Sequence, residues 1–192
     1  MKAIMVLILA AGLLPLAAQD TGLGSQGSGL GLFGSQNEAG IQGAVVLPEN
    51  DLRNAVGGRT GFGLGVHGAM AMDGGTEIRP RIDYTRLDGG SFSLSSISST
   101  TTVQEVSVGA DYLVYAGGTR QGLYGFASAN LAWWYTQNRF SGNTRKVSPT
   151  LLFGPGFRFN KSISGDLSFE YGQFRSSVGT ECNIKGSIFY SF

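Results

Sequence analysis

Cysteine and histidine are nearly absent from this chain of 192 residues, which contains one of each, Cys182 and His67. A lone cysteine cannot form an intramolecular disulfide. One cysteine and one histidine also cannot complete a standard structural zinc site. The sequence therefore excludes a disulfide-stapled scaffold, and it indicates neither a bound metal nor a cofactor.

Charge is the second scarce property. Charged residues make up 14% of the chain, with 14 Lys and Arg against 13 Asp and Glu. So balanced a composition leaves no basic stripe of the kind that binds nucleic acid. The mean hydropathy is only +0.04, which excludes a bundle of membrane helices. It is typical of membrane-spanning strands, in which apolar residues alternate with polar ones.

The one long apolar run lies at the N-terminus. Lys2 precedes the apolar residues 4–16, and the small residues Ala17 and Ala18 follow them. This pattern indicates an export signal peptide over residues 1–18, because the run is shorter than the roughly 20 residues that a spanning helix needs. No cysteine follows, so lipoprotein anchoring is not indicated. Residues 19–39 are rich in Gly, Ser and Gln, which predicts a flexible periplasmic tail.

From Gly40 onward the chain consists of alternating runs separated by turn residues, and eight runs can be counted. They cover approximately residues 40–47, 60–72, 76–87, 102–116, 121–136, 146–159, 163–174 and 182–192. An even number of strands brings both ends to one side, as expected for a bacterial barrel with periplasmic termini. The sequence therefore predicts an all-β fold over residues 40–192, an eight-stranded antiparallel up-and-down transmembrane β-barrel.

The links between these runs alternate in length. The second, fourth and sixth links are short, at residues 73–75, 117–120 and 160–162. The others, near 48–59, 88–101, 137–145 and 175–181, are longer and polar. Such two-sidedness is typical of outer-membrane barrels, which have short periplasmic turns and long extracellular loops. The apolar patch at residues 30–33 could pair with a strand edge or plug the barrel mouth, and both readings stay open.

The third run shows which face is the lumen. Ile78, Pro80, Ile82 and Tyr84 share one face, and a slip of one residue would place four charges in hydrocarbon. The same alternation in the other runs predicts an inward network of paired charges that replaces an apolar core. Its predicted members are Glu77, Arg79, Arg81, Asp83, Glu105, Asp111, Arg158, Asp166, Glu170 and Lys185, with His67 nearby.

Aromatic residues on the outward face are expected to form two belts at the membrane interfaces. The outer belt would hold Tyr84, Trp133, Tyr135 and Tyr171, and the periplasmic belt Tyr112, Phe157, Phe159, Tyr190 and Phe192. Three prolines, Pro80, Pro149 and Pro155, fall inside predicted strands. Each is expected at a bulge, near a rim, or opposite a backbone carbonyl that accepts its hydrogen bond from another group.

The C-terminal run alternates to its last residue, with Tyr190 and Phe192 on one face. It resembles the sorting signal that the barrel-assembly machinery of Gram-negative bacteria reads, although the usual glycine would sit one residue later than Gly186. The chain resembles the small outer-membrane barrels that include the OmpA transmembrane domain, OmpX-like and OmpW-like proteins. The resemblance rests on the number of strands, the alternation of short and long links, the charged lumen and the terminal Phe192. The resemblance implies an outer-membrane location, contact with outer-membrane lipid and insertion by the assembly machinery.

Three functions follow as hypotheses. The first is a structural or surface-interaction role in the envelope. The second is passage of small hydrophobic molecules, and the third, less favoured, is a barrel enzyme that modifies lipid A. His67 is the only candidate base, and no serine stands beside it in the sequence, so the sequence predicts no enzyme. No ligand can be named from the residues alone.

Overall fold

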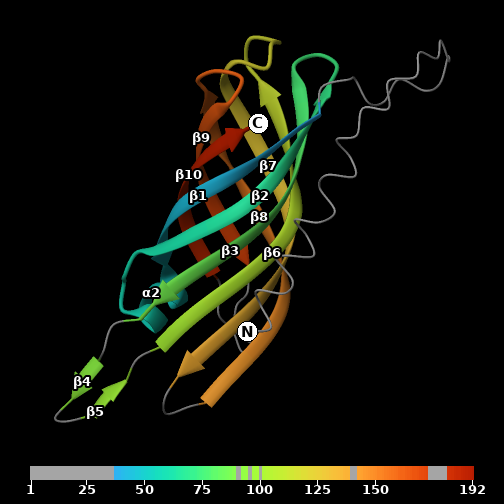
Figure 1. Ribbon diagram of the computed structural model, residues 1–192. Helices are drawn as coiled ribbons and strands as arrows, with labels where there is room; N and C mark the ends of the chain where they lie inside the picture. The colour runs from blue at the N-terminus through green and yellow to red at the C-terminus, as the bar shows by residue number, and fades with distance from the viewer. Residues whose placement is uncertain (1–36, 90–91, 95–96, 100, 139–141, 173–180) are drawn as a thin grey trace.

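Ten strands and one short helix form the described part of the chain, and eight of the strands close into a barrel (Figure 1). The structure is a computed structural model that describes residues 37–89, 92–94, 97–99, 101–138, 142–172 and 181–192. The barrel strands are β1 (Asn37–Glu49), β2 (Gly61–Met72), β3 (Thr76–Asp88), β6 (Thr101–Tyr115), β7 (Gly122–Asn138), β8 (Gly142–Arg158), β9 (Ile163–Gly172) and β10 (Glu181–Ser191). All neighbouring strands are antiparallel, and β1 closes the barrel against β10. The predicted fold class is confirmed.

The strand ends differ from the predicted ones in two places. Strand β1 begins at Asn37, inside the segment predicted to be a tail. The long link predicted near residues 137–145 is wrong, because β7 and β8 continue through it to the pair Asn138↔Gly142. These residues are polar on both faces, so hydropathy could not distinguish an extended ladder from a loop. The predicted signal peptide and residues 19–36 lie outside the described residues.

All three short turns lie where the sequence predicted them. Residues 73–75 join β2 to β3, 116–121 join β6 to β7, and 159–162 join β8 to β9. Gly74 and Gly75 have φ angles of 73° and 72°, in the left-handed region that glycine adopts without strain. In the third turn the Asn160 side chain accepts backbone hydrogen bonds from Ser162 and Ile163, both at 2.8 Å. We call this end of the barrel the short-turn end.

The opposite end, which we call the long-link end, carries elements that the sequence did not reveal. Helix α2 (Asn50–Val56) follows β1, and the strands β4 (Phe92–Leu94) and β5 (Ile97–Ser99) form a separate hairpin between β3 and β6. The C-terminus lies at the end opposite to α2 (Figure 1). Among the described residues, no helix has the length and apolar character needed to cross a bilayer.

Pro80 and Pro155 lie where the ladder is interrupted, as expected. Pairing of β2 with β3 passes from His67↔Arg81 to Met70↔Ile78 and skips Pro80. Pairing of β8 with β9 passes from Phe153↔Phe169 to Gly156↔Asp166 and skips Pro155. A proline therefore costs the sheet few hydrogen bonds at positions 80 and 155. The residues that would face Pro149 across this ladder lie outside the described residues, so its setting stays a prediction.

Candidate functional site: the filled lumen

Buried side chains occupy the middle of the barrel and both of its ends. A charged layer occupies the middle, an apolar cluster with α2 occupies the long-link end, and aromatic and charged residues occupy the short-turn end. The ten residues of the predicted lumen network are all buried, and each takes part in at least one ion pair with another lumen side chain.

Arg79 on β3 is the centre of the charged layer. Its guanidinium contacts Asp111 of β6 and Asp166 of β9, each at 2.8 Å, so it joins opposite walls of the barrel. The same group stacks over the Phe189 ring, 3.8 Å from its centroid. Arg79 is only 1% exposed. A cation so far from water depends on both carboxylates and on the ring for its stabilisation.

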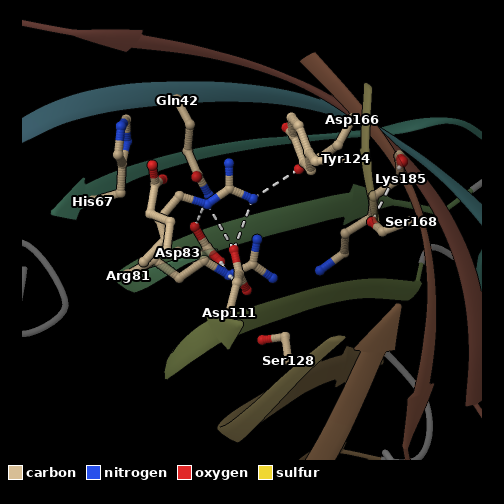
Figure 2. A network of polar contacts seen from close by, with 12 residues as sticks. Gln42, His67, Arg81, Asp83, Asp111, Tyr124, Ser128, Asp166, Ser168 and Lys185 are labelled. Atoms are coloured by element: carbon tan, nitrogen blue, oxygen red, sulfur yellow. Dashed lines mark hydrogen bonds and ion pairs between the residues drawn. The ribbon is translucent and has the colours of Figure 1, made fainter. Parts of the chain in front are cut away.

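Arg81 extends this layer along β3. Its Nε lies 3.1 Å from Asp83 and 3.3 Å from Asp111, so Asp111 is shared by two arginines. The amide of Gln42 on β1 donates a hydrogen bond to Asp83. Figure 2 shows Arg81, Asp83 and Asp111 pointing toward one another inside the barrel wall. The network therefore crosslinks β1, β3, β6 and β9.

Lys185 on β10 forms a second group nearer the long-link end. Its Nζ lies 2.6 Å from Glu170 and 3.4 Å from Glu105, which come from β9 and β6. The amide of Asn183 donates to Glu170 at 3.2 Å. Two carboxylates thus share one ammonium group, and loss of the lysine would leave both without their cation.

A third group closes the short-turn end, and half of it was not predicted. Arg158 lies 3.1 Å from Glu77, as expected from the inward faces of β8 and β3. Arg120 of the turn 116–121 also binds Glu77, at 2.9 Å, and reaches Glu38 at 3.0 Å. The sequence placed Glu38 in a tail and Arg120 in a turn. Because neither segment was predicted to be a strand, neither residue was predicted to point into the lumen. Burial lowers the pKa of Arg120, but Glu77 and Glu38 raise it overall, so the side chain remains a cation.

His67 has a neighbour that the sequence did not suggest. Its Nε2 lies 3.3 Å from the Oγ of Ser191, although 124 residues separate them. Both side chains are buried, and the Phe189 ring packs edge-on against the imidazole. Among the described residues, Nδ1 of His67 has no hydrogen-bond partner. The pair therefore lacks the carboxylate that orients the base in a catalytic triad.

Apolar side chains seal the long-link end. Leu52 and Val56, one turn apart on α2, pack with residues from four barrel strands. These are Val46, Leu87, Val103, Ala132 and Trp134. The helix ends at Gly57, whose φ of 66° lets Gly58 donate a backbone hydrogen bond to Arg53. Tyr115, Tyr124 and Phe126 form a second cluster toward the short-turn end, with Leu113 and Leu152.

The outer wall is apolar, and all the aromatic residues assigned to the two belts lie on it. Tyr84 and Trp133 both pair with Val106, in the part of their strands nearer the long-link end. Phe157 contacts Phe159, and Tyr190 contacts Phe192, near the short-turn end. Phe192 is 76% exposed, and its backbone N–H donates to Ala39. These residues lie toward the two ends of the wall, while their arrangement in belts at the membrane interfaces stays a prediction.

Metal binding receives no support from this arrangement. In the part of the chain that the structure describes, no three His, Cys, Asp or Glu side chains gather as metal ligands would. The carboxylates of the lumen instead face arginine or lysine side chains.

No protein-family model matches the chain, and no curated protein matches it. Solved structures of small outer-membrane barrels do resemble it. Neisserial surface protein A aligns at a TM-score of 0.55 and 14% identity, over 81% of this chain and 97% of that one. The N-terminal β-barrel domain of Pseudomonas aeruginosa OprF aligns at a TM-score of 0.51 and 14% identity, over 82% of this chain and 100% of that one. Ail, the attachment invasion locus protein of Yersinia pestis, aligns at a TM-score of 0.51 and 15% identity, over 81% of this chain and 97% of that one. At these identities the likeness establishes the fold.

Proposed function

We propose that this chain, which has the fold of the small eight-stranded outer-membrane β-barrels, lies in the outer membrane of a Gram-negative bacterium and has a structural or surface-interaction role there. Outer-membrane lipid would contact its apolar wall, and the barrel-assembly machinery would insert it. Export would remove residues 1–18, so that the mature protein begins at Gln19.

The observation that carries this proposal is the filled lumen. Ion pairs span the barrel at three levels, and α2 with its apolar neighbours covers the long-link end. An eight-stranded barrel is just wide enough for side chains to fill it. The interior therefore supports a role for the wall and for the links rather than for a pore.

The two other hypotheses find little support. A cavity of about 610 Å³ at the short-turn end is lined by polar and charged residues, among them Glu38, Arg120 and Arg158. A second cavity, beside β1 and β2, has a volume of about 10 Å³, room for about one water molecule, and is also lined mainly by polar residues. Neither cavity offers an apolar path for a hydrophobic solute. The enzyme reading would need a substrate to reach His67 and Ser191, which are 2% and 6% exposed.

Reconstituted protein should show no large, steady conductance in planar bilayers. Arg79, Arg81 and Trp134 cross the space that a solute would need, and all are nearly inaccessible. A porin in the same membrane serves as the positive control. Reproducible channels that admit sugars would show that the interior is open and would contradict the proposal.

Removal of Phe192 should slow insertion into the outer membrane, because the assembly machinery is proposed to recognise the end of β10. Pulse-chase labelling followed by separation of heated and unheated samples on gels measures the rate. Ile188→Ala, on the same outward face of β10, serves as the matched control, since it leaves the terminal residue in place. Equal rates for the wild type and the Phe192 deletion would contradict the recognition step.

The role itself is tested in cells. A strain that lacks the protein should lose envelope resistance to detergent or adherence to surfaces, with no change in uptake of small hydrophobic compounds. Selective loss of that uptake, with envelope resistance and adherence intact, would contradict the structural and surface role and favour transport.

A further inference from the structure

The cavity at the short-turn end, which we call the short-turn cavity, has the size of a small-molecule site. Its volume is about 610 Å³, and pockets that bind small ligands measure about 300 to 1,000 Å³. The side chains that carry its chemistry are of two kinds. Three are exposed in the turns 116–121 and 159–162, and three are partly or fully buried behind them: Gln121, Asn160 and Lys161 in front, and Glu38, Arg120 and Arg158 behind.

Two arginines form the inner wall of the short-turn cavity, and one buried carboxylate holds both. Glu77 is inaccessible, and it contacts Nε of Arg120 at 2.9 Å and the two terminal nitrogens of Arg158 at 3.1 and 3.2 Å. Glu38 contacts the same two guanidinium groups, at 3.0 and 3.7 Å. The ion pairs fix these side chains before any ligand arrives, and such preorganisation lowers the entropic cost of binding.

Positive charge exceeds negative charge at this site by one. Arg120, Arg158 and Lys161 are the cations of the lining, while Glu38 lines the cavity and Glu77 lies behind the arginines. The two arginines and the two glutamates balance one another within their cluster. The excess charge is therefore that of Lys161, which is exposed where a ligand would enter.

The mouth of the cavity offers hydrogen-bond donors. Asn160 uses Oδ1 to accept the backbone N–H groups of Ser162 and Ile163, both at 2.8 Å. Its amide is oriented by these bonds, so what it presents to a ligand is the donor Nδ2. The ammonium group of Lys161, the next residue, is also only a donor. Glu38 lies deeper and, as a carboxylate, can only accept.

We propose that the short-turn cavity binds a short peptide by its C-terminal carboxylate. Lys161 and Asn160 donate to the carboxylate, and Glu38 accepts from N–H groups of the peptide. An excess of one positive charge matches a carboxylate better than a phosphate group, which carries about −1.5 to −2. In the proposed orientation this end faces the periplasm, so the inference adds a periplasmic ligand to the structural or surface role.

The test is an NMR titration of the full-length mature barrel in detergent micelles. The probes are N-acetyl-trialanine with a free carboxylate and the same peptide with a C-terminal amide. The acid should shift the backbone amide signals of residues 119–121 and 159–162. It should bind about tenfold more tightly than the amide, because hydrogen bonds to a charged group are the stronger ones.

Two variants that each remove one exposed cation, at opposite ends of the barrel, provide the matched comparison. Lys161→Met should weaken binding of the acid about fivefold, as expected for one exposed ion pair, and leave binding of the amide unchanged. Arg53→Met, on α2 at the long-link end, should change either affinity less than about twofold. The heat-dependent gel shift shows that each variant is folded.

Equal affinities for the acid and the amide would overturn the inference, and so would equal effects of Lys161→Met and Arg53→Met. Tighter binding of inorganic phosphate than of the acid would overturn the choice of a carboxylate. These results are independent of the proposed envelope role, because they are obtained in detergent. Failure to fractionate with outer membranes would contradict that role and leave the peptide site standing.

Discussion

Replacement of Arg79 by methionine should lower the free energy of unfolding by about 3 to 5 kcal/mol, the usual cost of removing one member of a buried ion pair. The loss has a specific origin. Asp111 and Asp166 both lie within 2.8 Å of the guanidinium, and the substitution leaves these two buried carboxylates without their shared cation. Arg81 still reaches Asp111, but no second cation is within ion-pair distance of Asp166 among the described residues. Urea unfolding in detergent, followed by tryptophan fluorescence, measures the change.

Two further variants make this result interpretable. Arg53→Met removes an arginine whose pair with Glu49 is exposed, at 62% and 39%, so it should change stability by less than about 1 kcal/mol. The triple variant Arg79→Met, Asp111→Asn and Asp166→Asn also removes the two unpaired carboxylates. It should therefore recover part of the lost free energy of unfolding. An Arg79→Met barrel as stable as the parent would mean that water, and not arginine, satisfies these carboxylates.

Gly154→Val should prevent β8 from packing against β9. A Cβ atom at residue 154 would overlap the carbonyl oxygen of Leu167, and that backbone cannot move away as a flexible side chain could. The ladder between these strands is already interrupted at Pro155, so the close approach of the two backbones is a feature of this part of the wall. We expect a loss at the upper end of the range for overpacking, about 3 kcal/mol, with little heat-dependent gel shift.

Gly125→Val is the matched control for this variant. Gly125 pairs with Pro155 on the neighbouring strand, and no atom lies within 4 Å of the place its Cβ would occupy. Valine there faces outward and favours the strand conformation, so stability should change by less than about 1 kcal/mol. If both variants fold equally well, β8 and β9 are farther apart than the structure places them.

Alternation in the sequence was enough to separate lumen from wall. On β3, Glu77, Arg79, Arg81 and Asp83 are buried while Ile78 and Tyr84 face outward, as predicted. The prediction was strong there because every second residue was charged, and charges have only one stable side in a membrane-spanning strand. The short turns were equally clear, since Gly and Asn mark them.

Pairing between distant residues could not be predicted in this way. Alternation gives the face of Arg79 but not the strand across the lumen to which it reaches, because that depends on barrel shear and side-chain length. The same limit hid the approach of Ser191 to His67. Arg120 and Glu38 lie in segments without alternation, and α2 is only 7 residues long, so no periodic pattern marked them.

The central claim, a membrane-spanning barrel with a packed interior, is tested most directly by two adjacent tryptophans. Trp133 is 43% exposed on the outer wall, and Trp134 is 2% exposed inside the barrel. In lipid bilayers, phosphatidylcholine brominated near the headgroup end of its chains should quench the Trp134→Phe variant, in which Trp133 remains. The Trp133→Phe variant should be quenched neither by that lipid nor by aqueous iodide. Strong quenching of Trp134 by the brominated lipid would show that the strand faces are reversed, and strong quenching by iodide would show that the lumen is open to water.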